Sequence, residues 1–201
     1  MSNETLATEA LFLSGSLALD LINTEMVVRG KKHDVLSSSD ALARWWEEAC
    51  RWHPESRVIE AVGEPLTWKS TLLDDVKALR TALRTLSTHV VERQMVEKED
   101  LAPVNVILAL GYSSLERTAQ GNVKSVVYLR NPEKGNVLFP IAMSALRLFT
   151  ESDWQRLHKC KNDRCTLFFY DTTKSGTRHW CSLSCMNRSR SIRHYQATKK
   201  K

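Results

Sequence analysis

Glycine and proline are scarce in this chain, with 7 and 5 among 201 residues, while hydrophobic residues make up 42%. This composition excludes a collagen-like repeat and argues against a wholly disordered chain. Long hydrophobic runs are lacking too, because residues 137–146, for example, fall far below the roughly 20 residues of a membrane-spanning helix. The N-terminus carries Glu4 and Glu9 and has no basic start before an apolar run, unlike a secretory signal. We therefore expect a soluble, cytoplasmic protein that does not associate with a membrane.

Signatures of catalysis are also missing from the sequence. It contains neither the H-E-x-x-H motif of zinc proteases nor the H-x-E and P-C-x-x-C pair of zinc deaminases. No nucleophile with a neighbouring base and no phosphate-binding loop can be picked out. An enzyme is therefore the least supported class of function, and we expect no catalytic residues.

Charge is distributed unevenly along the chain, whose net charge is +6. Residues 155–201 hold 12 lysines and arginines against Asp163 and Asp171, which leaves +10 in this region and −4 on the remainder. A basic end beside a mildly acidic body suits attraction to a polyanion, because each neutralised phosphate releases condensed counterions. A merely solvated basic end would have the same composition, so charge alone does not decide the function.

Apolar periodicity predicts that most of the first 150 residues are helical. The clearest helix spans about residues 72–93, where apolar side chains recur at steps of three and four. Residues 40–51 follow a polar start and show the same spacing. A third helix should cover residues 100–110, with Pro103 in its first turn, where the missing N–H is harmless, and Gly111 at its end.

A β-hairpin is predicted after these helices. Residues 123–129 (Val-Lys-Ser-Val-Val-Tyr-Leu) and 137–139 (Val-Leu-Phe) flank the turn-forming stretch 131–136, which contains Asn, Pro and Gly. Pro140 should then begin a helix that continues to about residue 149.

Four of the five cysteines lie in the last 42 residues, as Cys160-x4-Cys165 and, after 15 residues, Cys181-x3-Cys185. Thiols stay reduced in the cytoplasm, and cysteine pairs at this spacing there usually bind zinc. Four thiolates close a tetrahedral shell, whereas a catalytic zinc keeps one position open. The sequence therefore predicts one structural Zn²⁺, and it leaves Cys50 outside the site.

An alternative ligand set would replace one cysteine with His158 or His179. That set would leave a cysteine uncoordinated beside an available metal, so the four cysteines are the predicted ligands.

The spacing of the cysteines also predicts how the metal site is built. Residues 161–164 form a short loop between the first two ligands, and residues 166–170 and 178–180 form a hairpin. A helix then begins near Cys185, which gives a treble-clef-like finger.

The helix after Cys185 is basic and poor in apolar residues, so most of its surface must face solvent or a partner. Asparagine and arginine are the side chains best shaped for paired hydrogen bonds with adenine and guanine, and arginine also clamps phosphate. We predict that Asn187 or Arg188 reads bases. Alternatively, Asn187 and Arg188 cap or brace the zinc site by donating hydrogen bonds to the thiolates or the backbone. The residues predicted to meet phosphates are Arg188, Arg190, Arg193, Lys199, Lys200 and Lys201.

The C-terminal motifs resemble those of a bacterial family, the CGNR zinc-finger proteins. The finger of that family reads C-x4-C, F-x-D, R-x-W-C-S and C-G-N-R, and the matching stretches here are residues 160–165, 169–171, 178–182 and 185–188. Met186 stands where the family has glycine, which removes any close backbone approach that glycine would allow. We expect metal binding to survive this difference.

The first 150 residues are similar to the ABATE domain that precedes the finger in this family, through residues 15–24 and 80–86. The resemblance implies a stress-induced transcription regulator in which the finger binds DNA and the larger domain senses a signal. Asp20, Asn23 and Thr24 lie in the first of these stretches. They are candidates for an effector-binding patch, and a hydrogen-bond network at a helix end is the alternative.

Together these patterns predict an α+β, mainly α fold: a helical, ABATE-like sensory body over residues 1–153 with a small β-hairpin, then a treble-clef-like finger over residues 154–201. The predicted function is a zinc-dependent, DNA-binding transcriptional regulator, and we expect a homodimer because one small finger makes few base contacts. A protein-interaction adaptor and an RNA-binding protein are the alternatives. Exposure of Phe168, Phe169 or Tyr195 would favour RNA, because these rings would stack on unpaired bases.

Overall fold

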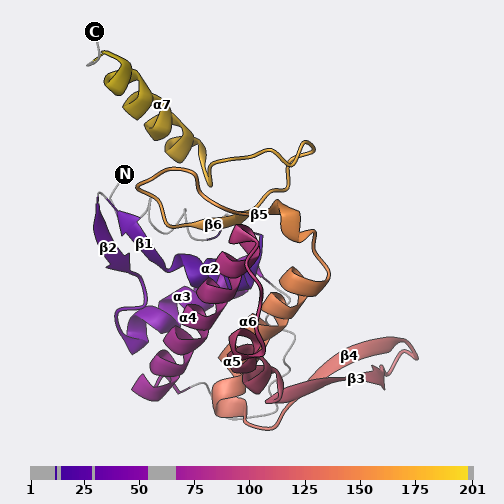
Figure 1. Cartoon of the computed structure of the whole chain (residues 1–201). Helices are drawn as coiled ribbons and strands as arrows, with labels where there is room; N and C mark the ends of the chain where they lie inside the picture. The colour runs from indigo at the N-terminus through magenta and orange to yellow at the C-terminus, as the bar shows by residue number, and fades with distance from the viewer. Residues whose placement is uncertain (1–11, 13–14, 29, 54–66, 199–201) are drawn as a thin grey trace.

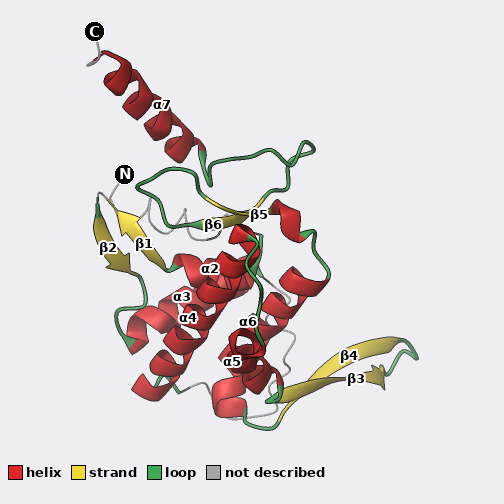
Figure 2. Cartoon of the chain, viewed as in Figure 1, coloured by secondary structure: helices red, strands yellow, loops and turns green. Residues whose placement is uncertain are grey.

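The computed structural model describes residues 12, 15–28, 30–53 and 67–198, and it confirms the predicted α+β, mainly α architecture (Figure 1). Helices predominate, and each sheet has only two strands (Figure 2). Among the described residues, no helix has the length and apolar character needed to cross a membrane. In chain order the elements are α2 (Leu17–Asn23), β1 (Glu25–Val28), β2 (Lys31–Asp34), α3 (Ser39–Trp52), α4 (Ser70–Glu92), α5 (Lys98–Leu108), β3 (Gly111–Arg117), β4 (Val123–Leu129), α6 (Pro132–Thr150), the 3-10 turn η2 (Trp154–Arg156), β5 (Leu157–Lys159), β6 (Phe168–Tyr170) and α7 (Leu183–Thr198).

The helices of the body pack around α2, a short helix whose seven residues are all buried. Both α4 and α6 contact it. The long helix α4 buries Val76, Leu79 and Leu83 at helical spacing. Helix α3 begins after Ser38, whose hydroxyl accepts a hydrogen bond from the Ala41 N–H at 3.2 Å. Both α3 and α4 lie close to their predicted spans, so apolar periodicity located the main helices correctly.

Helix α5 begins two residues earlier than predicted. Glu97 and Asp100 form its capping box, in which the Glu97 N–H donates to the Asp100 carboxylate at 3.0 Å. Pro103 is consequently the sixth residue of the helix and not in its first turn, so the predicted position of Pro103 was wrong.

Gly111, which was expected to end α5, is instead the first residue of β3. A Cβ at Gly111 would lie 2.9 Å from the Tyr128 carbonyl oxygen, so glycine permits the close approach of the two strands.

Of the two strands predicted for a hairpin at residues 123–139, the first is confirmed and the second is wrong. Strand β4 pairs with β3, in the register Gly111↔Leu129, and the predicted strand at 137–139 lies within α6. The stretch that resembled a turn is the start of that helix: the Asn131 side chain accepts from the Lys134 N–H and Pro132 occupies the first turn. The predicted helix start at Pro140 is therefore also wrong.

A second hairpin, β1–β2, was not predicted. It turns at Gly30, whose φ is +81°, and its first residue Glu25 pairs with Asp34. Arg80 of α4 is buried against it and forms two hydrogen bonds with the Asp34 carboxylate, at 2.6 and 2.8 Å. Burial raises the pKa of Asp34, but the hydrogen bonds and charge of Arg80 outweigh this effect, so the pKa lies below its ordinary value.

The finger is joined to the body by a seam formed by Asn23, Arg84, Thr166 and Phe168. The Asn23 amide donates to the Phe168 carbonyl at 2.8 Å and accepts from the Phe168 N–H at 2.9 Å. The Arg84 guanidinium donates to the Thr166 carbonyl at 3.3 Å and lies 5.9 Å from the centre of the Phe168 ring. Because Phe168 is only 1% exposed, β6 of the finger is part of the core of the body.

Candidate metal centre and nucleic-acid interface

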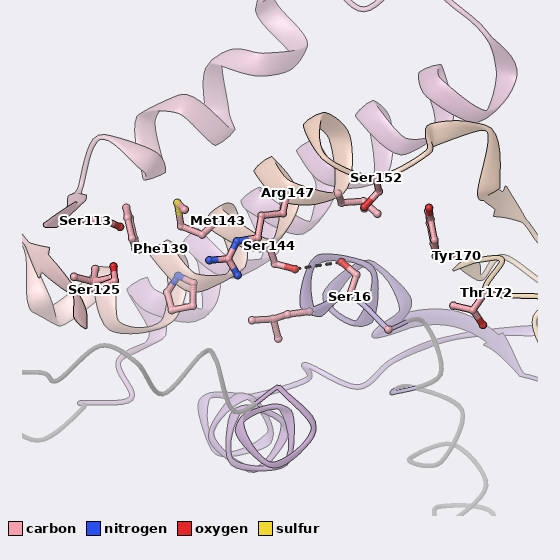
Figure 3. Close-up of a pocket in the computed structure, with 15 residues that line it drawn as sticks. Ser16, Ser113, Ser125, Phe139, Met143, Ser144, Arg147, Ser152, Tyr170 and Thr172 are labelled. Atoms are coloured by element: carbon pink, nitrogen blue, oxygen red, sulfur yellow. Dashed lines mark hydrogen bonds between the residues drawn. The ribbon is translucent and has the colours of Figure 1, made fainter. Parts of the chain in front are cut away.

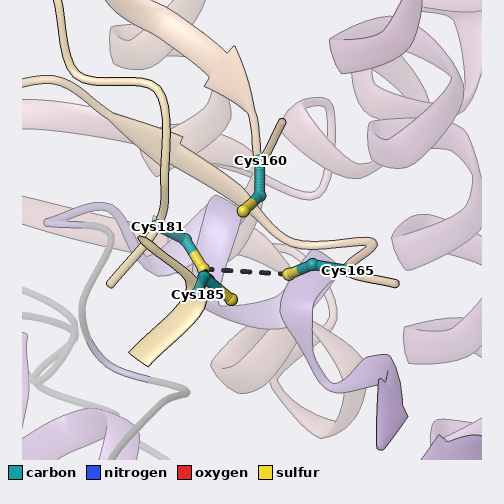
Figure 4. Close-up of side chains that lie close together, drawn as sticks. All are labelled: Cys160, Cys165, Cys181 and Cys185. Atoms are coloured by element: carbon teal, nitrogen blue, oxygen red, sulfur yellow. Dashed lines mark hydrogen bonds between the residues drawn. The ribbon is translucent and has the colours of Figure 1, made fainter. Parts of the chain in front are cut away.

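The four cysteine sulfurs of the finger converge on one point (Figure 4). Their Sγ atoms all lie within 4.8 Å of one another, with 3.5 Å between Cys181 and Cys185 and 3.8 Å between Cys165 and Cys181. Four sulfurs at about 2.3 Å from a tetrahedral zinc would be about 3.8 Å apart, so the cluster fits the metal. The cluster can therefore hold one zinc ion.

The first two ligands come from a short loop that Asn162 organises. The Cys165 N–H donates to the Asn162 carbonyl at 2.8 Å, and the Arg164 N–H donates to the Asn162 side-chain oxygen at 3.0 Å. The amide of this buried residue also donates to the Cys185 carbonyl at 3.0 Å and to the Ser189 hydroxyl at 3.1 Å. Asn162 thus ties the first pair of ligands to the helix that carries the last one. This role of Asn162 was not predicted, although an asparagine in so short a loop is typical of a side chain that bonds its own backbone.

The last two ligands flank the start of α7, as predicted. Cys181 precedes the helix, and Cys185 lies in its first turn, where its N–H donates to the Ser182 hydroxyl at 3.2 Å. A helix N-terminus also favours negative charge, which stabilises thiolates there. The histidines named as alternative ligands do not belong to the cluster of metal-binding side chains found among the described residues. His158 packs against Phe169, and burial lowers the pKa of its imidazole.

The predicted hairpin of the finger is wrong in its second strand. Strand β6 pairs with β5, while residues 178–180 form no strand and follow a loop. Buried Asp171 shapes this loop: its carboxylate accepts from the Thr173 N–H and the Arg178 N–H, both at 2.8 Å. These bonds turn the chain back toward the metal ligands through Gly176, whose φ is +63°. The N–H of residue 178 is therefore bonded to a side chain and not to a neighbouring strand.

The Asp171 carboxylate is held in its charged form. Burial raises its pKa, but hydrogen bonds from Thr173 and Arg178 outweigh burial and lower the pKa to about 2. Arg178 itself lies 4.8 Å from the centre of the Phe169 ring and donates its Nε–H to the Trp180 carbonyl at 2.8 Å. Aspartate and arginine of the finger motifs thus fix the loop between the two cysteine pairs.

Helix α7 extends away from the rest of the molecule (Figure 1). Asn187, Arg188 and Arg190 are exposed on it, and no hydrogen bond or ion pair among the described residues occupies their side chains. Asn187 and Arg188 were alternatively considered as braces of the zinc site. In the structure, Asn162 has that role through its bonds to the Cys185 carbonyl and the Ser189 hydroxyl. Arg193 lies in α7, although its side chain is not among those described, and residues 199–201 lie outside the described part.

Two of the three aromatic side chains that would have favoured RNA are inaccessible. Phe168 and Phe169 are each 1% exposed, so neither ring can stack on an unpaired base. Tyr195 is 59% exposed on α7. Of the three rings named for the RNA-binding alternative, the two on β6 are thus buried against the body, and Tyr195 is exposed.

The residues considered for an effector patch are buried and hydrogen-bonded. Asp20 lies 2.6 Å from the His53 ring nitrogen, and Asn23 bonds the Phe168 backbone in the seam. The Thr24 hydroxyl donates to the Leu21 carbonyl at 2.7 Å and accepts from Arg80 at 2.9 Å. The structure thus places all three in networks that hold the end of α2, and none of them lines the two cavities described for this molecule.

Comparison with known proteins gives two matches along the chain. The ABATE family model, described as "Putative stress-induced transcription regulator", matches residues 15–152. The CGNR zinc finger model matches residues 156–197, a range that includes all four clustered cysteines. Among curated proteins, none matches the chain.

Proposed function

Because this chain belongs to the ABATE family and ends in a CGNR zinc finger, we propose that it is a zinc-dependent regulator that binds DNA through α7 and responds to a signal through its body. The proposal places it in the bacterial cytoplasm, together with the genome, and assigns it no catalytic reaction. The family description supplies the regulatory class. The exposed basic helix beside the metal site supports DNA binding.

The observation that carries the proposal is the exposed basic surface of α7. Arg188 and Arg190 are exposed and free of acidic partners among the described residues, one turn beyond the metal ligand Cys185. Cationic side chains on a helix that extends from a fixed base can reach phosphates, and releasing the condensed counterions drives association. Asn187, exposed on the same helix, is the side chain proposed to reach a base edge.

Zinc has a positioning role in this proposal. When bound, it would link the loop at Cys160 and Cys165 to the start of α7, because the two cysteine pairs come from these two segments. The remaining geometry is set by the chain itself, through Asn162 and the Ser182 cap. We further propose that the protein acts as a homodimer, since one short helix makes few base contacts and regulators commonly read paired half-sites.

The test is a fluorescence-anisotropy titration of the zinc-loaded chain with genomic DNA fragments at two salt concentrations. We expect salt-sensitive binding, and the double variant Arg188→Ala/Arg190→Ala should lose about two phosphate contacts, which makes the negative slope of log K against log salt shallower by about 2. Arg44→Ala/Arg51→Ala on α3 is the matched control, because it removes the same charge from another exposed helix surface. Absence of binding at low salt would contradict the proposal and favour an adaptor that docks an acidic protein.

A further inference from the structure

A cavity of about 510 Å³ lies where the body meets the finger. Figure 3 shows that it runs from Ser113 and Ser125 on the β3–β4 hairpin, along α6, to Tyr170 and Thr172 of the finger. The start of α2 forms another wall through Ser16. Its volume falls in the range of about 300–1,000 Å³ typical of small-molecule sites. The cavity thus touches the two regions that a signal would have to connect.

Arg147 is the basic side chain in the described lining of this cavity, and no described residue supplies it with a counter-charge. Arg147 of α6 points into the middle of the cavity in Figure 3, and no ion pair or hydrogen bond with another described residue occupies its guanidinium. No aspartate or glutamate belongs to the described lining. The other polar groups there are mostly hydroxyls, which can accept or donate hydrogen bonds. Such a lining suits a carboxylate, since arginine binds one with two parallel charge-assisted bonds.

Apolar side chains complete the walls and argue against a bare inorganic anion. Phe139 and Met143 of α6 and Val127 of β4 line the cavity beside the guanidinium. A ligand that covers these groups would remove apolar surface from water, at about 25 cal/mol for each Å². We propose that this cavity binds a small carboxylate with an apolar body, its carboxylate on Arg147 and its apolar part against Phe139 and Met143.

The position of the cavity explains how such a ligand would act on the finger. Tyr170 and Thr172 line it on either side of Asp171, whose carboxylate holds the loop that leads to Arg178 and the second cysteine pair. A ligand that orders Tyr170 and Thr172 would therefore favour one arrangement of this loop. The inference rests on the signal-sensing part of the proposed function and gives it a site and a ligand class.

Isothermal titration calorimetry on the zinc-loaded full chain, without DNA, tests the site with phenylacetate as the probe. We expect saturable binding of phenylacetate, and binding at least tenfold weaker for phenylacetamide, which has the same shape but no charge, and for inorganic phosphate, which has no apolar body. Arg147→Gln should weaken phenylacetate binding at least tenfold. Arg44→Gln, the same change at an exposed position of α3, should leave phenylacetate binding unchanged.

A second variant separates the cavity from nonspecific attraction to arginine. Ser125→Phe puts a ring into the hairpin end of the cavity and should block phenylacetate without changing the charge. The inference would be overturned if phenylacetate showed no saturable binding, or if phenylacetamide or phosphate bound equally well. It would also be overturned if Arg147→Gln or Ser125→Phe bound phenylacetate as tightly as the wild type. Because DNA is absent from the titration, such a result would leave the anisotropy test of DNA binding unaffected.

Discussion

The body and the finger are stabilised by different means, although one seam joins them. One buried cluster takes most of its aliphatic and aromatic side chains from α2, α3, α4 and α6 of the body, and finger residues such as Phe168 join it at the seam. Among the described residues, the finger has two strands of three residues, and its buried apolar side chains are few: three cysteines, two leucines and the aromatic pair of β6 (Cys160, Cys181, Cys185, Leu157, Leu167, Phe168 and Phe169). A unit this small needs a metal or another link to hold its fold. We therefore expect the fold of the finger to depend on zinc and that of the body not to.

Replacing one ligand is the most severe test of this difference. Cys181→Ser should abolish stoichiometric zinc binding and unfold the finger, because a structural zinc supplies about 10–16 kcal/mol in small zinc domains. The body should keep its own unfolding transition. Metal analysis and circular dichroism during urea unfolding measure both effects. Cys50→Ser on α3, outside the cluster, is the control, and unchanged zinc content in Cys181→Ser would refute the assigned ligands.

The seam allows the independence of the two regions to be tested next. Asn23→Ala would leave the buried N–H and carbonyl of Phe168 without their partner, which should cost about 2–6 kcal/mol at roughly 1–3 kcal/mol for each group. The finger should detach while the zinc content stays at one per chain. Hydrogen exchange of β6 reports the detachment. Asn105→Ala, an exposed asparagine of α5, should have no such effect, and unchanged protection of β6 in Asn23→Ala would show that the seam contributes little.

Within the body, the Asp34–Arg80 pair gives a smaller effect that depends on pH. Asp34→Asn should destabilise the body by about 1–3 kcal/mol at pH 7, since Arg80 is buried and Asp34 is about one-third exposed. The pKa of Asp34 is lowered in the folded state, so its contribution is present above the unfolded value of 3.8 and disappears as the pH falls through the folded value. Urea unfolding of both proteins between pH 7 and pH 3 should show converging stabilities. A difference that stays constant would contradict the assignment.

The smallest expected effect concerns the start of α7. Ser182→Ala removes the hydroxyl that accepts from the Cys185 N–H, which should cost about 1 kcal/mol, or about fivefold in zinc affinity. Competition with a chromogenic chelator measures this change. Ser184→Ala, an exposed serine in the same turn, is the control and should match the wild type. Equal affinities for all three proteins would mean that the cap does not support the metal site.

Local patterns in the sequence predicted α3, α4 and the cluster of four cysteines well. The spacing of apolar residues in α3 and α4 reports the buried face of each helix directly, and the paired cysteines report a common metal. The errors occurred where one local signal fits two structures. Asn131-Pro132 is typical both of a turn and of a helix start, and only the burial of the following residues in the core decided for α6.

The sequence by itself thus determined α3, α4, the four-cysteine cluster and the exposed basic helix. The helices follow from residues a few positions apart, and the cluster follows from two closely spaced cysteine pairs of one chemical type. The tertiary structure decided which strands pair, why Asp20, Asn23 and Thr24 are buried, and where Arg147 faces hydroxyls from the hairpin and the finger. These features join residues up to 145 positions apart, as in the bond between Asn23 and Phe168. Such contacts leave no periodic signal in a single chain, since their geometry arises only when the core packs.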